Sequence, residues 1–356
     1  MRLRLLLALA GLLVVPALPS AAAERERWDT RVFARVESPG YPANVYVHPN
    51  GKVYAGTFSN PSGDSLRSVV REWSKSGALL HSWTVPRQDL AESHGVQVAT
   101  SDARGRLVIL DKTSGRVLRL NPDTGRFTSY SRLADLPTCP ASGPCSPNVN
   151  DEKPIPNYAA WGPHGALFVT DYAQAVVWKI PPGGGRAKPW FTSKLLDGIE
   201  FGTAGLVTAP DHKSLLVMQQ TSLGLGEGSA PMGKLYRLRL KDRLLTRLWV
   251  SRPMDLPDGF ALARSGRVYL ACAGSNQLVV LDSSFKEVER VPALPVTGEN
   301  SSSIPFDTPS NMTFAGRRVL IANQAFLGDV THHAILDVYV GERGVPVFVP
   351  RSAGAR

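Results

Sequence analysis

The sequence predicts an all-β protein with the architecture of a six-bladed β-propeller. Three observations predict it: a tight polar turn occurs six times, successive turns are 47 to 60 residues apart, and short apolar runs flank each turn. The turn positions are residues 51, 105, 165, 212, 266 and 316. A sequence repeat of about 40 to 50 residues is typical of four-stranded propeller blades.

Each turn contains a residue pair that suits a tight hairpin. Five turns have glycine, as in Asn50-Gly51 and Ser265-Gly266, and the fourth has the polar pair Asp211-His212. Glycine accepts a positive φ without steric cost, which favours two-residue hairpin turns. The runs on either side, such as residues 44–47 before a turn and 168–170 after one, are rich in β-branched and aromatic residues and predict strands.

A third strand follows in five of the units. The candidates are residues 117–120, 176–180, 235–238, 278–281 and 335–339, and residues 127–130 and 248–250 are candidate outer strands. No stretch of a dozen residues has helical periodicity, and glycine and proline interrupt every interval, so antiparallel sheets are favoured. A two-sheet sandwich would not explain six turns at nearly constant spacing.

The repeat also predicts where the blades begin and how the ring closes. The blades should begin near residues 43, 96, 157, 204, 258 and 311. We expect a strand at residues 31–36 to pair with the last blade near residues 345–349, which closes the ring and protects its edges.

The N-terminus predicts export from the cytoplasm. Residues 1–23 contain Arg2 and Arg4, an apolar run over residues 5–15, and small residues at 20–23. This pattern is typical of a removable secretory signal peptide, and the apolar run is too short to span a bilayer comfortably. We therefore expect a secreted or periplasmic protein with one propeller domain over residues 24–356, and a retained N-terminal anchor is the alternative.

The charge of the chain limits its partners. The 40 basic and 30 acidic residues give a formal net charge of +10, and the surplus is spread over hairpins and outer strands. Such a distribution is typical of solvated faces, although an anionic ligand or a cell-envelope polymer is an alternative. No compact basic motif occurs and an export signal is present, so we expect no nucleic-acid partner. No stretch after residue 23 is apolar enough to cross a membrane, so we expect no membrane span. The expected partner is a small-molecule ligand or substrate, and we expect a monomer.

The three cysteines predict one disulfide. Cys139 and Cys145 lie in a proline-rich stretch, and an oxidising compartment would favour their pairing. Cys272 lies in an apolar strand and is expected to be buried. The disulfide would stiffen an insertion at residues 134–156, which ends where the third blade begins, so we expect this insertion to be a lid over the central opening.

Candidate functional residues lie where the innermost strand of each blade begins. Reading back about eight residues from each turn gives polar side chains in four blades: Gln97, Asn157, Asp258 and Asn311. His94 precedes the second blade's innermost strand. Asn and Asp at strand starts commonly cap turns, which is the alternative interpretation of each residue alone. Their alignment across the repeat favours a site at one end of the channel, with His94, Gln97 and Asn311 binding substrate.

Segments at these positions resemble a known family. The segments PNYAAWGPHGALFVTD at 156–171, GLVTAPDHK at 205–213 and PDGFA at 257–261 are similar to the senescence-marker/gluconolactonase/luciferin-regenerating family of six-bladed propellers. This resemblance implies hydrolysis of lactones or related esters with one divalent cation, often calcium. It assigns Asp258 to the metal and to catalysis, and Asn157 to the metal, its bound water and the substrate.

The sequence departs from the family at two ligand positions. No acid stands at the start of blade one, near Ala43, and Ala204 replaces an asparagine in blade four, where Asp197 is an alternative metal ligand. Because calcium prefers six to eight oxygen ligands and several carboxylates, we expect calcium to bind weakly or not at all.

We therefore expect a secreted, gluconolactonase-like hydrolase of a lactone or a small ester. One alternative is a propeller that binds a small molecule without turnover, which a resemblance of residues 94–111 to the yellow/royal-jelly propellers favours. The other alternative is a scaffold for protein contacts. No Gly-x-Ser-x-Gly, phosphate-loop or His-Glu-x-x-His motif occurs.

Overall fold

The computed structural model describes residues 24–59, 65–112, 114–139, 144–148, 152–199, 201–222 and 230–355. The predicted signal peptide at residues 1–23 lies outside the described residues. Within these ranges, no helix is long and apolar enough to cross a membrane.

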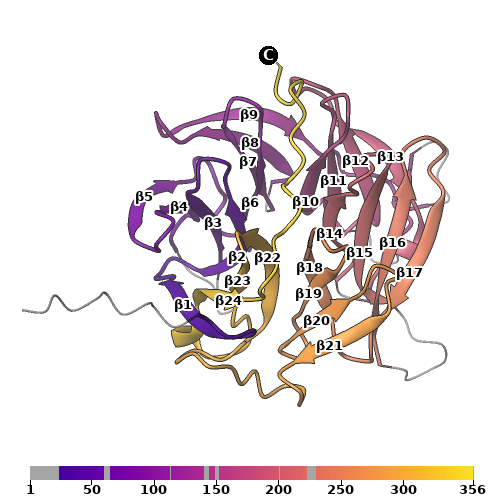
Figure 1. The fold of residues 1–356 in the computed structure, drawn as a ribbon. Coiled ribbons are helices and arrows are strands. Elements are labelled where there is room, and N and C mark those ends of the chain that lie inside the picture. Colours follow the sequence, from indigo (N-terminus) through magenta and orange to yellow (C-terminus); the bar gives the residue numbers. More distant parts are fainter. Residues whose placement is uncertain are drawn as a thin grey trace, which may run out of the picture.

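The chain forms six four-stranded antiparallel sheets arranged as the blades of a propeller (Figure 1). Blade 1 consists of β2 (Tyr41–Val47), β3 (Val53–Phe58), β4 (Val69–Trp73) and β5 (Leu79–Thr84). Blade 2 consists of β6 (Val96–Ser101), β7 (Leu107–Asp111), β8 (Arg116–Asn121) and β9 (Arg126–Arg132). Blade 3 consists of β10 (Pro156–Trp161), β11 (Leu167–Asp171), β12 (Val176–Ile180) and β13 (Lys188–Thr192).

The other three blades follow the same order. Blade 4 consists of β14 (Thr203–Thr208), β15 (Ser214–Ser222), β16 (Met232–Arg239) and β17 (Leu245–Val250). Blade 5 consists of β18 (Pro257–Leu262), β19 (Val268–Cys272), β20 (Gln277–Leu281) and β21 (Glu287–Val291). Blade 6 consists of β22 (Pro309–Ala315), β23 (Arg318–Asn323), β24 (Ala334–Tyr339) and, on the outside, β1 (Thr30–Arg35). Two short 3₁₀ helices, η1 (Lys194–Leu196) and η2 (Val330–His332), lie between strands.

The six predicted turns are confirmed. Each joins the first two strands of a blade, and its marker residue has a positive φ: five are glycines, and His212 has a φ of 54°. The histidine tolerates this left-handed conformation because a short hairpin requires it there. Its ring packs on Phe348, with 3.8 Å between the ring centroids.

The predicted closure of the ring is right about the strand and wrong about its partner. β1 pairs with β24 and not with residues 345–349. Pro346 lies in that segment and Pro350 directly follows it, and neither proline has an N–H to donate to a ladder. It runs instead across one end of the channel, where the Val345 N–H donates to the Leu262 carbonyl at 2.8 Å (Figure 1).

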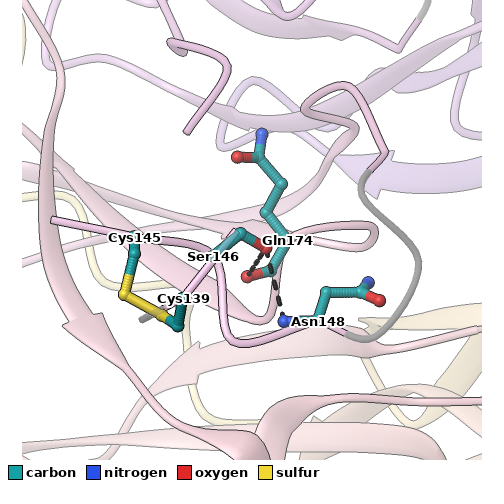
Figure 2. The surroundings of a disulfide bond; sticks show 5 residues. All are labelled: Cys139, Cys145, Ser146, Asn148 and Gln174. Carbon is teal, nitrogen blue, oxygen red and sulfur yellow. Dashed lines mark hydrogen bonds between the residues drawn. A yellow bond between two sulfur atoms is a disulfide. The ribbon is translucent and has the colours of Figure 1, made fainter. Parts of the chain in front are cut away.

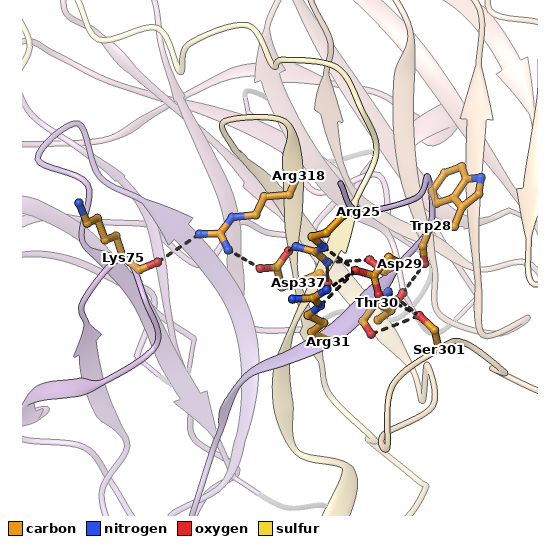
Figure 3. Close-up of polar contacts among 9 residues, drawn as sticks. All are labelled: Arg25, Trp28, Asp29, Thr30, Arg31, Lys75, Ser301, Arg318 and Asp337. Atoms are coloured by element: carbon orange, nitrogen blue, oxygen red, sulfur yellow. Dashed lines mark hydrogen bonds and ion pairs between the residues drawn. The ribbon is translucent and has the colours of Figure 1, made fainter. Parts of the chain in front are cut away.

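An ionic network fastens the closing strand. The Arg25 guanidinium contacts both Asp29, at 2.7 Å, and Asp337, at 2.8 Å. Asp337 also pairs with Arg318, which donates to the backbone of Lys75 in blade 1 (Figure 3). The residues before β1 are therefore tied to blade 6, and blade 6 is tied to blade 1.

The innermost strands share an irregularity at their first residues. In five blades the register to the second strand shifts there, as between Pro257 and Phe260 in blade 5 and between Pro156 and Ala159 in blade 3. A β-bulge re-aims the side chains of the bulged residues. Asp258 and Asn157 both lie within such bulges, at the end of the channel that we call the mouth.

Candidate functional site

Asp258 is a buried carboxylate at the mouth. It is 9% exposed, and its Oδ1 accepts no hydrogen bond from the described residues. Burial raises the pKa of Asp258 to about 7, against the opposing effects of Lys112 and of a hydrogen bond from Tyr158. An unpaired buried carboxylate oxygen costs folding free energy, which is typical of residues retained for function.

Tyr158 connects Asp258 with blade 6. Its hydroxyl donates to the Ser310 carbonyl at 3.0 Å and lies within reach of the side chains of Asp258 and Asn311. Burial, and next the Asp258 charge, raise the pKa of Tyr158 well above its ordinary value. The tyrosine therefore stays protonated and remains a hydrogen-bond donor.

The two predicted asparagines link neighbouring blades. The Asn311 Oδ1 accepts from the Val45 N–H at 2.9 Å, and the Asn157 Nδ2 donates to the Thr203 carbonyl at 3.4 Å. Both contacts pair a side chain with a backbone group of the next blade. Asn311 belongs to the same cluster as Asp258 through Tyr158, whereas Asn157 precedes Tyr158 in the chain.

A second set of residues surrounds the mouth, at an equivalent position near the end of the second strand in each of four blades. These residues lie at, near or just after the end of the second strand of a blade, and each is paired with the residue before or at the start of the innermost strand. In four consecutive blades they are Phe58, Lys112, Tyr172 and Gln220. Their side chains meet: the Lys112 Nζ lies 4.8 Å from the Phe58 ring centroid and 5.3 Å from that of Tyr172, and the Tyr172 hydroxyl donates to the Gln220 Oε1 at 3.3 Å.

Lys112 is the functional candidate that the sequence reasoning missed. It belongs to blade 2, opposite Asp258 in blade 5, because three steps around a six-bladed ring reach the far side. Burial lowers the pKa of Lys112 to about 8, and the charge of Asp258 opposes that shift. The signal in the sequence was the repeat itself, since Lys112 directly follows the predicted second strand of blade 2.

The remaining predicted residues lie in different surroundings. His94 is buried, and its ring nitrogens lie 2.7 Å from the Leu66 carbonyl and 3.2 Å from the Glu92 carbonyl. Gln97 is buried, and its Oε1 has no hydrogen-bond partner among the described residues. Asp197 caps the end of η1: its carboxylate accepts from the Gly198 N–H at 2.9 Å, and its carbonyl accepts from the Gln219 Nε2 at 2.8 Å.

The residues around Asp258 do not fit a divalent cation. No three His, Cys, Asp or Glu side chains come together as a metal-holding group in the part of the chain that the structure describes. The positions of two expected ligands are Ala43 and Ala204, and the Asn311 Oδ1 is used by a backbone N–H. Lys112 adds a positive charge that would repel a cation, whereas calcium needs several negative oxygen ligands.

The predicted disulfide between Cys139 and Cys145 is present (Figure 2). Gln174 holds the chain on both sides of the disulfide: its carbonyl accepts from the Ser146 hydroxyl at 3.1 Å, and its Oε1 accepts from the Leu136 N–H at 2.9 Å. Gln174 lies two residues beyond Tyr172, so the described part of the insertion is anchored beside the mouth.

The opposite end of the channel is crossed by the C-terminal segment. Residues 345–348 and the innermost strands line a cavity of about 100 Å³. The C-terminal segment covers this end of the channel, and the polar residues gather at the other end, the mouth.

Comparison with known proteins supports the fold. No protein-family model and no curated protein matches the sequence. Among solved structures, the chain is similar to virginiamycin B lyase from Staphylococcus aureus at 14% identity, with a TM-score of 0.53 over 87% of this chain and 99% of the other.

Two further solved structures are similar to this chain. One is a protein proposed to be a gluconolactonase, at 17% identity and a TM-score of 0.55, over 89% of this chain and 93% of the other. The other is the calcium-binding protein regucalcin from Agrobacterium tumefaciens, at 14% identity and a TM-score of 0.55, over 90% and 98%. Identities this low establish a shared propeller fold, and the chemistry must be argued from the site.

Proposed function

We propose that this chain is a hydrolase that opens a lactone or a small ester at the channel mouth. The observation that carries the proposal is the buried Asp258 carboxylate, which has one unpaired oxygen and a lysine opposite it. The enzymes among the structural neighbours, a lyase and a proposed gluconolactonase, support a hydrolase- or lyase-type propeller.

The chemistry assigned to Asp258 is general base catalysis. A pKa of about 7 allows the carboxylate to accept a proton from water near neutral pH and to return it later as an acid. Tyr158, held protonated, donates to the Ser310 carbonyl and lies beside the carboxylate, whose pKa it lowers. We assign Asn157 to substrate orientation, because it begins the innermost strand that carries Tyr158.

Hydrolysis of a panel of lactones and p-nitrophenyl esters tests this proposal. The wild-type chain should turn over at least one of them, and Asp258→Asn should lower kcat by roughly 10²- to 10⁴-fold, the usual share of general base catalysis. Asp242→Asn is the matched control, because that carboxylate pairs with Arg239 on an exposed hairpin. Saturable binding of a panel compound without turnover would favour a small-molecule-binding propeller instead.

We also propose that the protein is exported and monomeric. The N-terminal apolar run and the Cys139–Cys145 disulfide support export, because disulfides persist in oxidising compartments. The outer strand β1 completes the sixth blade, which removes a reason for strand exchange between copies. Cell fractionation and the molar mass from light scattering test the two statements.

A further inference from the structure

The Asp258 carboxylate has a positive charge opposite it that the protein itself supplies. We infer that Lys112 takes the place that a divalent cation holds in a metal-dependent lactonase, and that its ammonium stabilises the oxyanion formed on the substrate carbonyl. This inference rests on the hydrolase function proposed above. It makes the reaction independent of metal and adds Lys112 as a catalytic residue.

The repeat places Lys112 for this role. Its backbone N–H pairs with the Gly95 carbonyl at 2.9 Å, the contact that fixes the corresponding Tyr172 and Gln220 in the next two blades. Its ammonium lies over the faces of Phe58 and Tyr172 and makes no hydrogen bond or ion pair with the described residues. Aromatic faces hold a cation in position without consuming its N–H donors.

The two unpaired groups define the ligand. Lys112 offers N–H donors, the Asp258 Oδ1 offers an acceptor, and together they are a pair of opposite charges facing one mouth. A pair with no net charge favours a neutral, dipolar ligand over an anion, which the carboxylate would repel. An uncharged lactone or ester with water matches both groups, because its carbonyl accepts a hydrogen bond and the water donates one.

The reaction balances with these two residues and water alone. The water oxygen bonds to the carbonyl carbon as its proton passes to the Asp258 carboxylate, and the carbonyl π electrons move to the oxygen beside Lys112. The tetrahedral intermediate then reforms the C=O bond and breaks the bond to the alkoxy oxygen, which takes the proton back from Asp258. One ester and one water become one hydroxy acid, or an acid and an alcohol, and Asp258 is regenerated.

Calorimetry with calcium chloride tests the inference without reference to turnover. The wild-type protein, dialysed against a chelator, should give no Asp258-dependent binding heat at micromolar calcium. With so few oxygen ligands, any dissociation constant for calcium should be about 10⁻⁴ to 10⁻³ M or weaker. Micromolar calcium binding that disappears in Asp258→Ala would overturn the inference. This result stands even if every ester in the panel is inert, so failure of the hydrolase proposal is distinguishable.

Kinetics test the role of the charge. Lys112→Met keeps most of the side-chain volume and should lower kcat by roughly 10²- to 10³-fold, as loss of an oxyanion donor does, with a smaller change in KM. Lys112→Arg should retain more activity than Lys112→Met. Lys179→Met is the matched control, because Lys179 also lies over an aromatic ring, 5.9 Å from that of Phe168, on an outer face. An unchanged kcat in Lys112→Met, or activity that chelation abolishes and calcium restores, would contradict the inference.

Discussion

At the scale of single residues, Asp258 illustrates how function opposes stability. Its pKa is about 7 in the folded protein and 3.8 in its ordinary state, so the folded form binds the proton more tightly. Stability from this group is complete below pH 3.8 and is lost as the pH rises towards 7. Above pH 7 the fold carries the whole cost of a buried charge.

Asp258→Asn should therefore stabilise the protein at pH 8. We expect a gain of about 1–3 kcal/mol in the free energy of unfolding at pH 8, and little or no gain at pH 4, because the wild-type carboxyl is then protonated. Chemical denaturation at the two pH values measures both numbers. A variant that is less stable than the wild type at pH 8 would contradict the assignment of a strained, unpaired carboxylate.

Asp171 should respond in the opposite way, although burial raises its pKa too, to about 6. Its carboxylate accepts from the Ile155 and Ala173 N–H groups, at 3.0 and 3.1 Å, and from the Trp178 Nε1 at 2.8 Å. An amide would turn a donor towards some of these donors, so Asp171→Asn should cost about 2 kcal/mol at pH 8. Equal effects of the two substitutions would show that hydrogen bonding does not separate the two carboxylates.

The sequence could predict Asp258 and not its partner. Asp258 and Asn311 stand at a repeated position, the start of an innermost strand, where polar residues are conspicuous. Lys112 stands at a different repeated position, where the equivalent residues Phe58 and Tyr172 have unrelated chemistry. The repeat implies that blades 2 and 5 lie opposite each other, yet it does not distinguish Lys112 from the other residues at its position as the one that faces Asp258.

At the scale of elements, the disulfide stabilises only the loop in which it lies. Cys139 and Cys145 enclose a short loop, for which chain entropy gives about 2 kcal/mol at most. The double variant Cys139→Ser/Cys145→Ser should lower the unfolding free energy by no more than that and should increase hydrogen exchange at residues 134–148. Unchanged exchange there, or two free thiols in the native exported protein, would contradict the described loop.

The turns were the most predictable elements. A hairpin needs a residue of positive φ, and glycine provides it at five of six positions. His212 could still be assigned, because the period required a turn there. The fourth strands were less predictable: β5 (Leu79–Thr84) and β13 (Lys188–Thr192) lie on the outside, where one exposed face removes the constraint on composition.

At the scale of the whole molecule, the closure of the ring depends on Asp337. It is 5% exposed and pairs with Arg25, from before β1, and with Arg318 (Figure 3). Asp337→Ala should cost about 3 kcal/mol, because two guanidinium groups lose their common partner in a mostly buried site.

The exposed pair of Asp242 and Arg239 is again the control, since Asp242→Ala should cost about 0.5 kcal/mol or less. Differential scanning calorimetry of the two variants measures the contrast. Equal shifts would mean that the ring closes without help from this network.

The closing strand could be predicted and its partner could not. An N-terminal strand in an otherwise complete set of blades must join the last blade, whichever strand it meets. The apolar composition of residues 345–349 suggests that they form the partner strand. Two prolines stand on either side of residues 347–349, however, and residues 345–348 line the cavity at the end of the channel. The sequence does not show that residues 345–349 cross one end of the channel, so it could not show that β1 pairs with a different strand.

The central claim is that the buried Asp258 and the half-buried Lys112 form a functional pair of opposite charges. The most direct measurement is the pKa of Asp258, from a carboxyl ¹³C NMR titration of aspartate-labelled protein, with the resonance assigned by its absence in Asp258→Asn. The account predicts a pKa of about 7, which rises further in Lys112→Met because the lysine charge lowers it. A pKa near 3.8 that Lys112→Met leaves unchanged would contradict the account.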